Sequence, residues 1–161
     1  MDNRTKILDC TLSLFSERGY DAVGIQEIVD TAGVTKPTLY HYFSNKRGLL
    51  DQLLERDFSV FNAKIREKAD YRGDLTLTLE NIVREFFQYA KERPAVLRLQ
   101  LSLHFAPADS ESNQAVRRFN QEQYEIIENL FRLAVREHGN MRGREQAYAA
   151  TFIGMIHTYV G

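Results

Sequence analysis

The amino-acid sequence predicts an all-α protein, with a small three-helix domain at the N-terminus and a larger helical bundle after it. Apolar residues recur three and four positions apart along most of the 161 residues, which is the period of an amphipathic helix. The three prolines, together with Gly19 and Gly33, fall at the ends of these periodic segments. With 43% hydrophobic and 27% charged residues, the composition is typical of a globular protein and excludes a disordered chain.

Four helices are predicted in the first part of the chain. The first spans residues 5–18 and ends at Gly19, since glycine tolerates the left-handed conformation that closes a helix. The second spans 24–31, and the third runs from Lys36 to Phe43 with Thr35 as its N-cap and Pro37 in its first turn. The fourth starts at residue 45 and continues into the sixties, with Ser44 as its predicted cap.

Helices are also predicted over 75–90, 114–137 and 143–161, with a loop over 107–113. Residues 97–105 are ambiguous, because leucines alternate with polar residues as in a strand. We choose a helix, which places Leu97, Leu101 and Phe105 on one stripe, because a lone strand has no partner for its backbone groups. The predicted buried faces are Leu75, Leu79, Ile82, Val83, Phe86, Phe87 and Ala90, then Val116, Phe119, Ile126, Ile127, Leu130, Phe131 and Ala134, and finally Ala149, Phe152, Ile153, Ile156 and Val160.

Charge and cysteine usage limit the class of protein. The net charge is -1, which excludes a globally basic nucleic-acid binder but permits a local basic patch. A single cysteine cannot form an intramolecular disulfide, and no signal peptide is visible, so we expect a cytoplasmic protein. Residues 146–161 carry no charged side chain but are too few to span a membrane. That pattern stops without a polar tail, so we expect the natural protein to continue.

Residues 31–50 contain the features that predict function. This window holds three cations and no acid, and its two short helices meet at Gly33, which permits a tight turn. Ala32 lets the helices cross closely, while Ile28, Val29, Val34 and Leu39 bury their inner faces. Hydroxyls, aromatic rings and one cation remain on the outside of the second helix, at the reach needed in a DNA major groove. These outward residues are Lys36, Pro37, Thr38, Tyr40, His41 and Tyr42.

The run from Thr5 to Leu50 resembles the DNA-binding domain of the tetracycline-repressor (TetR) family of bacterial transcription regulators. The residues that carry the resemblance are Ile7-Leu8, Leu14-Phe15, Gly19-Tyr20, Ile25, Ile28-Val29, Ala32-Gly33-Val34, Thr38-Leu39-Tyr40, Tyr42-Phe43, Lys46 and Leu49-Leu50. The sequence departs from the family at Gly24, where a Thr or Ser usually caps the second helix. Glycine caps less well by about a few tenths of a kcal/mol, and Asp21 is the alternative cap.

The resemblance implies roles for individual residues. Tyr42 and Lys46 match positions that hold the DNA backbone, as Thr38 and Tyr40 commonly do. Lys36, Pro37, His41 and Gln26 match positions that face base edges. The DNA-binding set is Gln26, Thr35, Lys36, Pro37, Thr38, Tyr40, His41, Tyr42 and Lys46.

The resemblance also implies two functional parts, a DNA-binding domain over 1–47 and an effector-binding and dimerisation domain over 48–161. We expect a homodimeric repressor that binds a palindromic operator in double-stranded DNA and is released by a small-molecule effector. The aromatic and histidine candidates for lining the effector pocket are Phe61, Phe87, His104, Phe105, Tyr124, Phe131 and Phe152.

No catalytic or metal-binding motif is found in the sequence, so no enzyme, metal or cofactor is predicted. The four histidines are widely spaced, without the spacing of metal ligands. His104 is weighed as a satisfied core histidine or as the polar anchor of a ligand cavity. The alternative function is a helical ligand-binding or protein-interaction module that does not read DNA.

Overall fold

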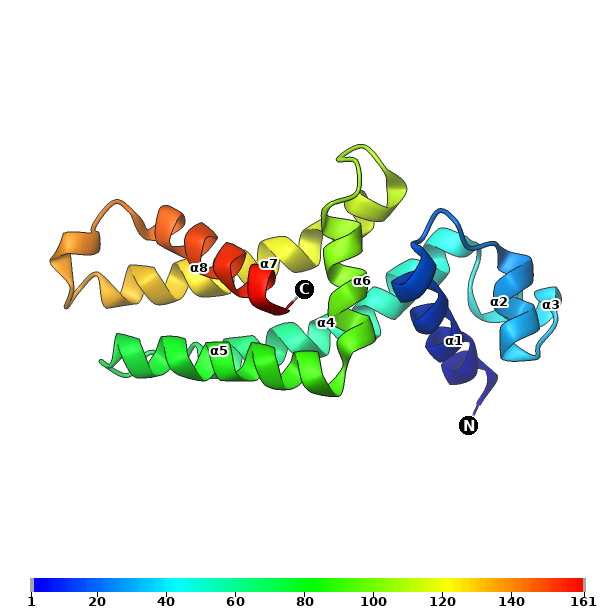
Figure 1. Cartoon of the computed structure of the whole chain (residues 1–161), viewed down its shortest axis with the longest axis horizontal. Coiled ribbons are helices and arrows are strands. Elements are labelled where there is room, and N and C mark those ends of the chain that lie inside the picture. Colours follow the sequence, from blue (N-terminus) through cyan, green and yellow to red (C-terminus); the bar gives the residue numbers. More distant parts are fainter. Residues whose placement is uncertain (1, 161) are drawn as a thin grey trace. The chain divides into compact units, whose positions relative to one another are not determined.

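The computed structural model describes residues 2–160, and within that range it contains eight α-helices, one short 3₁₀ helix and no strand (Figure 1). The all-α fold class is therefore confirmed. The helices are α1 (Asn3–Arg18), α2 (Ile25–Ala32), α3 (Lys36–Tyr42), α4 (Lys46–Lys68), α5 (Leu75–Glu92), α6 (Pro94–His104), α7 (Glu111–Ala134) and α8 (Glu145–Val160), with the 3₁₀ helix η1 at Gly139–Met141.

The chain divides into two compact units, which are described separately. The first unit consists of the chain up to Phe58 together with Ala95–Arg117, and the second consists of Ser59–Pro94 and the chain from Arg118 onward. Both α4 and α7 contribute residues to each unit. The two units are defined by contacts between residues and not by function. The boundary at residue 47 between the DNA-binding and the effector-binding parts therefore stays a prediction.

In the first unit, α1 packs against α2 and α3 around the start of α4 (Figure 1). Ile28, Val29 and Leu39 are buried as predicted, whereas Val34 is only half-buried. Thr35 caps α3 as predicted, by accepting a hydrogen bond from the Thr38 amide. Gly24 starts α2 with no side-chain cap, so the alternative of an Asp21 cap was wrong.

The predicted cap of α4 was also wrong. The side chain of Asn45, rather than Ser44, accepts a hydrogen bond from the Gly48 amide at 2.7 Å. Asn45 lies directly before the first residue of the helix, whereas Ser44 is one residue too early for this geometry.

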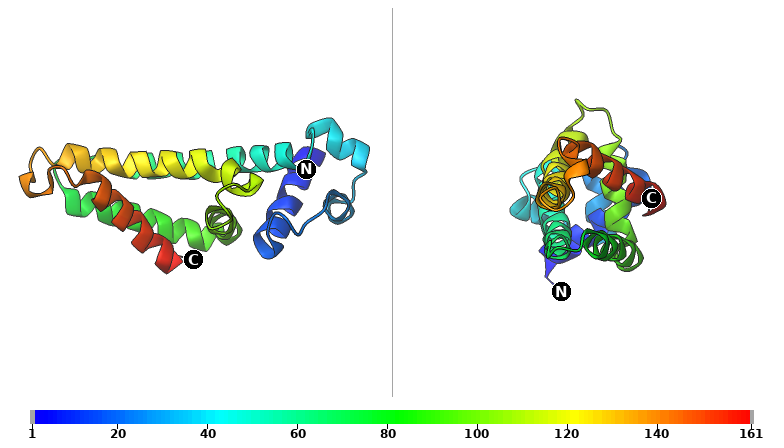
Figure 2. Two further views of the ribbon diagram at one scale, coloured as in Figure 1. Left: turned by 90° about the horizontal axis from the view of Figure 1, so that it is seen from above. Right: turned by 90° about the vertical axis from the view of Figure 1, so that its left-hand side faces the viewer.

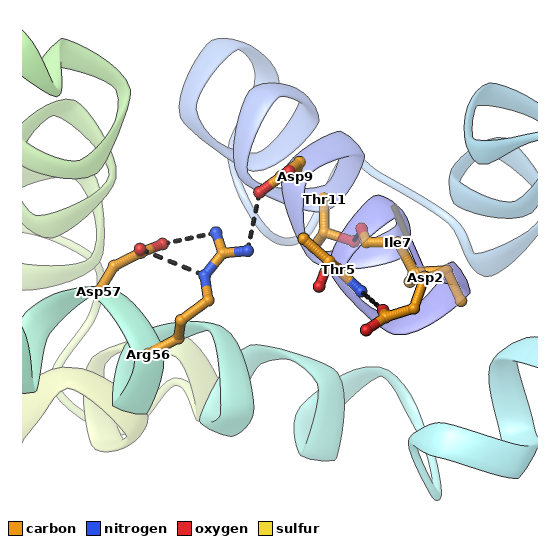
Figure 3. A network of polar contacts seen from close by, with 7 residues as sticks. All are labelled: Asp2, Thr5, Ile7, Asp9, Thr11, Arg56 and Asp57. Carbon is orange, nitrogen blue, oxygen red and sulfur yellow. Dashed lines mark hydrogen bonds and ion pairs between the residues drawn. The ribbon is translucent and has the colours of Figure 1, made fainter.

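A partly exposed ion pair joins α4 to α1 within the first unit (Figure 3). The guanidinium of Arg56 donates to Asp57 on its own helix at 2.8 Å and to Asp9 on α1 at 2.7 Å. Asp57 is buried, and the guanidinium compensates part of the cost of burying its carboxylate. The first half of α4 is thereby held in a defined register along α1.

Residues 94–104 form the helix α6, as chosen over the strand, but its buried stripe is not the predicted one. Leu97 is buried as predicted, but Leu101 is half-buried and Phe105 is 77% exposed. The other buried residues of this helix are Val96, Leu99, Gln100 and Leu103. The helix starts at Pro94 and ends at His104, so Phe105 follows its last residue and lies in solvent.

The second unit is built around aromatic rings from α4 and α5. Phe61 stacks on Tyr89 with a centroid separation of 4.2 Å and meets Phe86 edge to face. The buried residues of α5 are Thr78, Ile82, Glu85, Phe86 and Tyr89. Of the predicted face, only Ile82 and Phe86 are buried, because polar groups with partners take part of it. The other predicted positions are half-buried, as for Leu75, Leu79, Val83 and Ala90, or exposed, as for Phe87. The Thr78 hydroxyl donates to the Asp74 carbonyl, and Glu85 pairs with Lys64.

After η1, the chain turns back as α8, which packs along α5 (Figure 2). Ala149, Phe152 and Ile156 are buried as predicted, but Ile153 and Val160 are only half-buried. On α7, which starts three residues earlier than predicted, Ile126 is half-buried and the other predicted positions are buried. No helix in the described range is long and apolar enough to cross a membrane.

Candidate nucleic-acid interface

A glycine corner joins α2 to α3. Gly33 adopts a left-handed conformation with φ 60° and ψ 41°, which closes α2. The amide of Val34 donates to the Val29 carbonyl at 3.0 Å, so the backbone groups at the end of α2 are satisfied within the turn. A side chain at residue 33 would carry the strain of a positive φ, and this explains the glycine.

The helix α3 has a fully buried inner face and an exposed polar outer face. Leu39 has no exposed surface, and Phe43 directly after the helix is 1% exposed. The predicted DNA-binding residues of this segment divide into two groups by exposure. Thr35, Lys36, Pro37, Tyr40 and His41 are exposed, while Thr38 and Tyr42 are half-buried. The His41 and Tyr42 rings meet edge to face at 5.0 Å, which restricts both.

Gln26 also lies on the surface, at the second residue of α2. Its amide donates to the Asp30 carboxylate one turn later, at 2.8 Å. The side chain is accessible, but this bond must open or rearrange before the amide can pair with a base edge.

The C-terminal end of α3 is held by Gln52 of α4, which sequence reasoning missed. Its amide nitrogen donates to the Tyr42 carbonyl at 3.3 Å, and its amide oxygen accepts from Arg4 of α1 at 2.8 Å. A polar residue in the interior of a helix carries no sequence signal for such a role, because a solvated glutamine gives the same pattern.

Lys46, at the first residue of α4, lies against aromatic rings. Its ammonium is 4.2 Å from the centroid of the Tyr20 ring and 5.9 Å from that of Phe15. This burial lowers the pKa of Lys46 from its ordinary value. The ammonium is therefore fixed in position by a cation–π contact, and a phosphate contact by the same group stays a prediction.

The predicted effector-binding residues are not gathered at one place. Phe61, Phe131 and Phe152 are buried in the second unit, and there the Phe131 and Phe152 rings meet edge to face. Tyr124 is half-buried, and its hydroxyl donates to the Gln146 carbonyl at 3.1 Å. Phe87 is 47% exposed on the outer face of α5.

His104 and Phe105 are exposed at the end of α6, in the first unit, with their rings edge to face. Both interpretations of His104, as a core histidine and as an anchor inside a cavity, were wrong about its burial. His104 is the last residue of α6, and Phe105 follows the end of the helix.

Two cavities can be described, one in each unit. A cavity of about 240 Å³ in the first unit lies between residues 18–22 and the end of α6 with Ser112. The other, of about 280 Å³, lies along α4 and α7 of the second unit and is lined mainly by polar residues such as Arg66, Glu122 and Asn129. None of the predicted aromatic residues lines either of these two. The described residues include no cluster of three side chains that could hold a metal ion.

Together, the glycine corner, the buried inner face of α3 and its exposed polar outer face define a helix-turn-helix protein. Comparisons with known proteins agree. The sequence pattern described as "Bacterial regulatory proteins, tetR family" matches residues 7–53. The chain is therefore similar to TetR-family regulators over this N-terminal segment.

Two curated relatives are transcriptional regulators by name. The HTH-type transcriptional repressor KstR2 of Rhodococcus jostii is 36% identical over 80 residues, which are 50% of this chain and 39% of the relative. The biofilm operon regulator IcaR of Staphylococcus aureus is 30% identical over 102 residues, or 62% of this chain and 53% of IcaR. The matched segments thus span about half of these relatives or less.

The likeness extends over the whole fold in solved structures. The regulator FadR of Bacillus subtilis, solved in complex with stearoyl-CoA, superposes with a TM-score of 0.81 and 20% sequence identity. The match covers 97% of this chain and 84% of FadR. At this identity the likeness shows that the helices of the second part follow the same fold.

Proposed function

We propose that the protein is a transcriptional regulator that binds operator DNA through α3. The observation that carries this proposal is the division of α3 into two faces. Leu39 and Phe43 bury its inner side completely, so the exposed rings and hydroxyls outside are not needed for folding. A rigid helix that presents such groups beside a cation suits the major groove.

Within this interface, the residues take two kinds of role. Lys36 donates to guanine acceptors, Pro37 contacts a thymine methyl, and His41 faces a base edge, with Gln26 reading an adenine beside them. The phosphate backbone is bound by Thr35, Thr38, Tyr40, Tyr42 and Lys46, which fix the register of the helix on the duplex.

We further propose that the regulator is a homodimeric repressor. A two-fold dimer places two copies of α3 in successive major grooves, roughly 34–36 Å apart, and therefore recognises a palindrome. The helix α8 carries no charged side chain after Glu145 and is the candidate for the dimer contact, because Met155 and Tyr159 are exposed on it. Such a regulator acts on chromosomal DNA, which places it in the cytoplasm.

A small-molecule effector is proposed to release the DNA. The effector must bind more tightly to the state that does not bind the operator than to the state that does. The difference must be several kcal/mol, and about 5.5 kcal/mol moves the equilibrium from 1:99 to 99:1. The aromatic side chains predicted to form its pocket are in part buried, as for Phe61, Phe131 and Phe152. Because FadR is solved with stearoyl-CoA, long-chain acyl-CoA is the first effector class to test.

The experiment that tests DNA recognition is selection of bound duplexes from a random pool. An enriched palindrome, bound with an affinity that falls as salt rises, is the expected result. Lys36→Ala should relax the preference at one base position, whereas Lys46→Ala should weaken binding to every sequence. Failure to enrich any sequence, with no salt-dependent binding, would leave a helical module that does not read DNA.

A further inference from the structure

The corner between α1 and α2 faces the corner between α6 and α7 within the first unit. Residues 18–22 on one side and Leu103, Ala106 and Ser112 on the other line the cavity of about 240 Å³ described above. The two corners are therefore not close-packed over this area. Their separation depends on the few directional bonds that cross between them.

Glu111, the first residue of α7, makes those bonds. Its carboxylate accepts a hydrogen bond from the Tyr20 hydroxyl, and its backbone carbonyl accepts one from the Arg47 guanidinium at 3.1 Å. Arg47 is itself oriented by Asp51, one turn later on α4, at 2.9 Å. Glu111 is thus bonded both to Tyr20, the second residue after α1, and to the start of α4.

Tyr20 connects this bond to the DNA-binding residues. Its ring is buried, meets Phe15 edge to face at 5.2 Å, and carries the Lys46 ammonium at 4.2 Å. Burial and the bond to Glu111 raise the pKa of the Tyr20 hydroxyl far above its ordinary range, so it remains a donor at physiological pH. A displacement of Glu111 therefore moves the Tyr20 ring, on which the Lys46 ammonium lies.

The corner that carries Glu111 is stiff. The side-chain amide of Asn113 donates to the carbonyls of Leu103, His104 and Ala106, which satisfies the end of α6. The Ser110 hydroxyl accepts from the Asn113 amide at 3.1 Å and so caps α7. Because α6 and α7 are joined into one block at this corner, their movement reaches Tyr20 with little loss.

We infer that Glu111 is a positioning residue. Through its bonds to Tyr20 and Arg47 it sets the orientation of the DNA-binding helices α1, α2 and α3. This rests on the proposed function, since the orientation matters only for a dimer that must match two half-sites. Loss of the bond leaves α3 and its own contacts intact. Without the bond, the orientation of the DNA-binding helices is less restricted, and the affinity for DNA depends less on the spacing between the two half-sites.

The experiment uses the full chain and the palindrome selected by it, together with two duplexes in which the half-sites are moved apart or together by one base pair. One base pair shifts a half-site by roughly 3.4 Å along the axis. The measured quantity is the ratio of the affinity for the selected spacing to that for the altered spacings. Thermal unfolding is followed in parallel.

Tyr20→Phe and Glu111→Ala should each lower this ratio about tenfold or more, the size expected when a hydrogen bond to a charged group is lost. Glu111→Gln keeps an acceptor oxygen and should retain most of the discrimination. Tyr71→Phe is the matched control, because it removes a tyrosine–glutamate bond of 2.8 Å to Glu137 in the other unit. That variant should discriminate as the unmodified protein does.

An unchanged ratio in both Tyr20→Phe and Glu111→Ala, with duplex binding retained, overturns the positioning role alone. A uniform loss of affinity for all three spacings overturns it as well, because a general loss of stability acts on every duplex equally. If no duplex is bound by the unmodified chain, the proposed function fails and this inference fails with it.

Discussion

The helices α3 and α5 both carry neighbouring aromatic residues, yet different features determine which side chains of each helix are buried. On α3 and the residue after it, apolar Leu39 and Phe43 are buried and the polar-tipped Tyr40 is 49% exposed. On α5, apolar Phe87 is 47% exposed while Glu85 is buried. A small three-helix core needs every apolar side chain, whereas a longer helix can bury a polar group when a partner is within reach.

Phe43→Ala against Phe105→Ala tests the first half of this comparison. Removing the buried Phe43 ring should cost about 3–5 kcal/mol of the free energy of unfolding, from lost transfer energy and an unfilled cavity. The same change at Phe105, which is 77% exposed, should cost about 0.5 kcal/mol or less. Urea unfolding of both variants measures the difference. Equal costs would contradict the assignment of Phe105 to the surface.

Lys64 and Glu85 test the second half. Lys64 Nζ lies 3.3 Å from Glu85 Oε1, an atom buried without a hydrogen bond, so the ion pair is what compensates this carboxylate. Lys64→Met leaves the buried charge without its partner and should cost about 1–3 kcal/mol. Adding Glu85→Leu to that variant should recover most of the loss, because a well-packed apolar pair replaces an ionic one.

The control for this pair is Lys68→Met. Lys68 pairs with Glu67 at 3.2 Å on the surface, where the Glu67 side chain is 74% exposed. Such exposed pairs contribute about 0–1 kcal/mol. If Lys64→Met costs no more than Lys68→Met in the same unfolding assay, the buried carboxylate does not depend on the ion pair.

These contrasts explain how much of the fold the sequence predicts. Periodicity places the helices other than α6 and the glycine corner, because the period depends on backbone geometry and on the distribution of apolar residues. The helix at α6 was chosen because a lone strand has no partner for its backbone groups. The rotation of α5 and α6 is not predicted. Thr78, Glu85 and Gln100 are buried through side-chain interactions and packing that hydrophobicity alone does not represent.

The candidate site shows the same limit. The exposed residues of α3 could be predicted, because the inner face of a seven-residue helix leaves little choice for the rest. The roles of Gln52 and Glu111 could not, since each depends on bonds to residues 10 to 91 positions away. The aromatic candidates for an effector pocket were chosen by residue type, and type does not distinguish Phe131 inside from Phe105 outside.

A smaller effect is expected at the start of α4, where the side chain of Asn45, and not that of Ser44, caps the helix. Asn45→Ala removes the acceptor of the Gly48 amide and should cost about 1 kcal/mol, the usual value for an N-cap. Ser44→Ala, one residue earlier, should cost clearly less, because the Ser44 side chain is not the cap. Thermal unfolding of the two single variants decides between the positions, and the reverse order would restore the original sequence prediction.

The smallest effect concerns pH and the polar pairing of α4 with α7 in the second unit. The hydrogen bond from Asn62, followed by that from Arg66, lowers the pKa of Glu122 below its ordinary value. A carboxyl group with a lower pKa in the folded state stabilises the protein above its unfolded pKa, about 4.3. That contribution is lost as pH falls through the folded pKa. Because the side chain is 38% exposed, screening holds the effect to about a few tenths of a kcal/mol.

Glu122→Gln should therefore lower stability slightly at pH 7 and reduce its loss below about pH 4.3, measured by urea unfolding across that range. An identical pH dependence in both proteins would show that this carboxylate gains nothing from its two partners on folding.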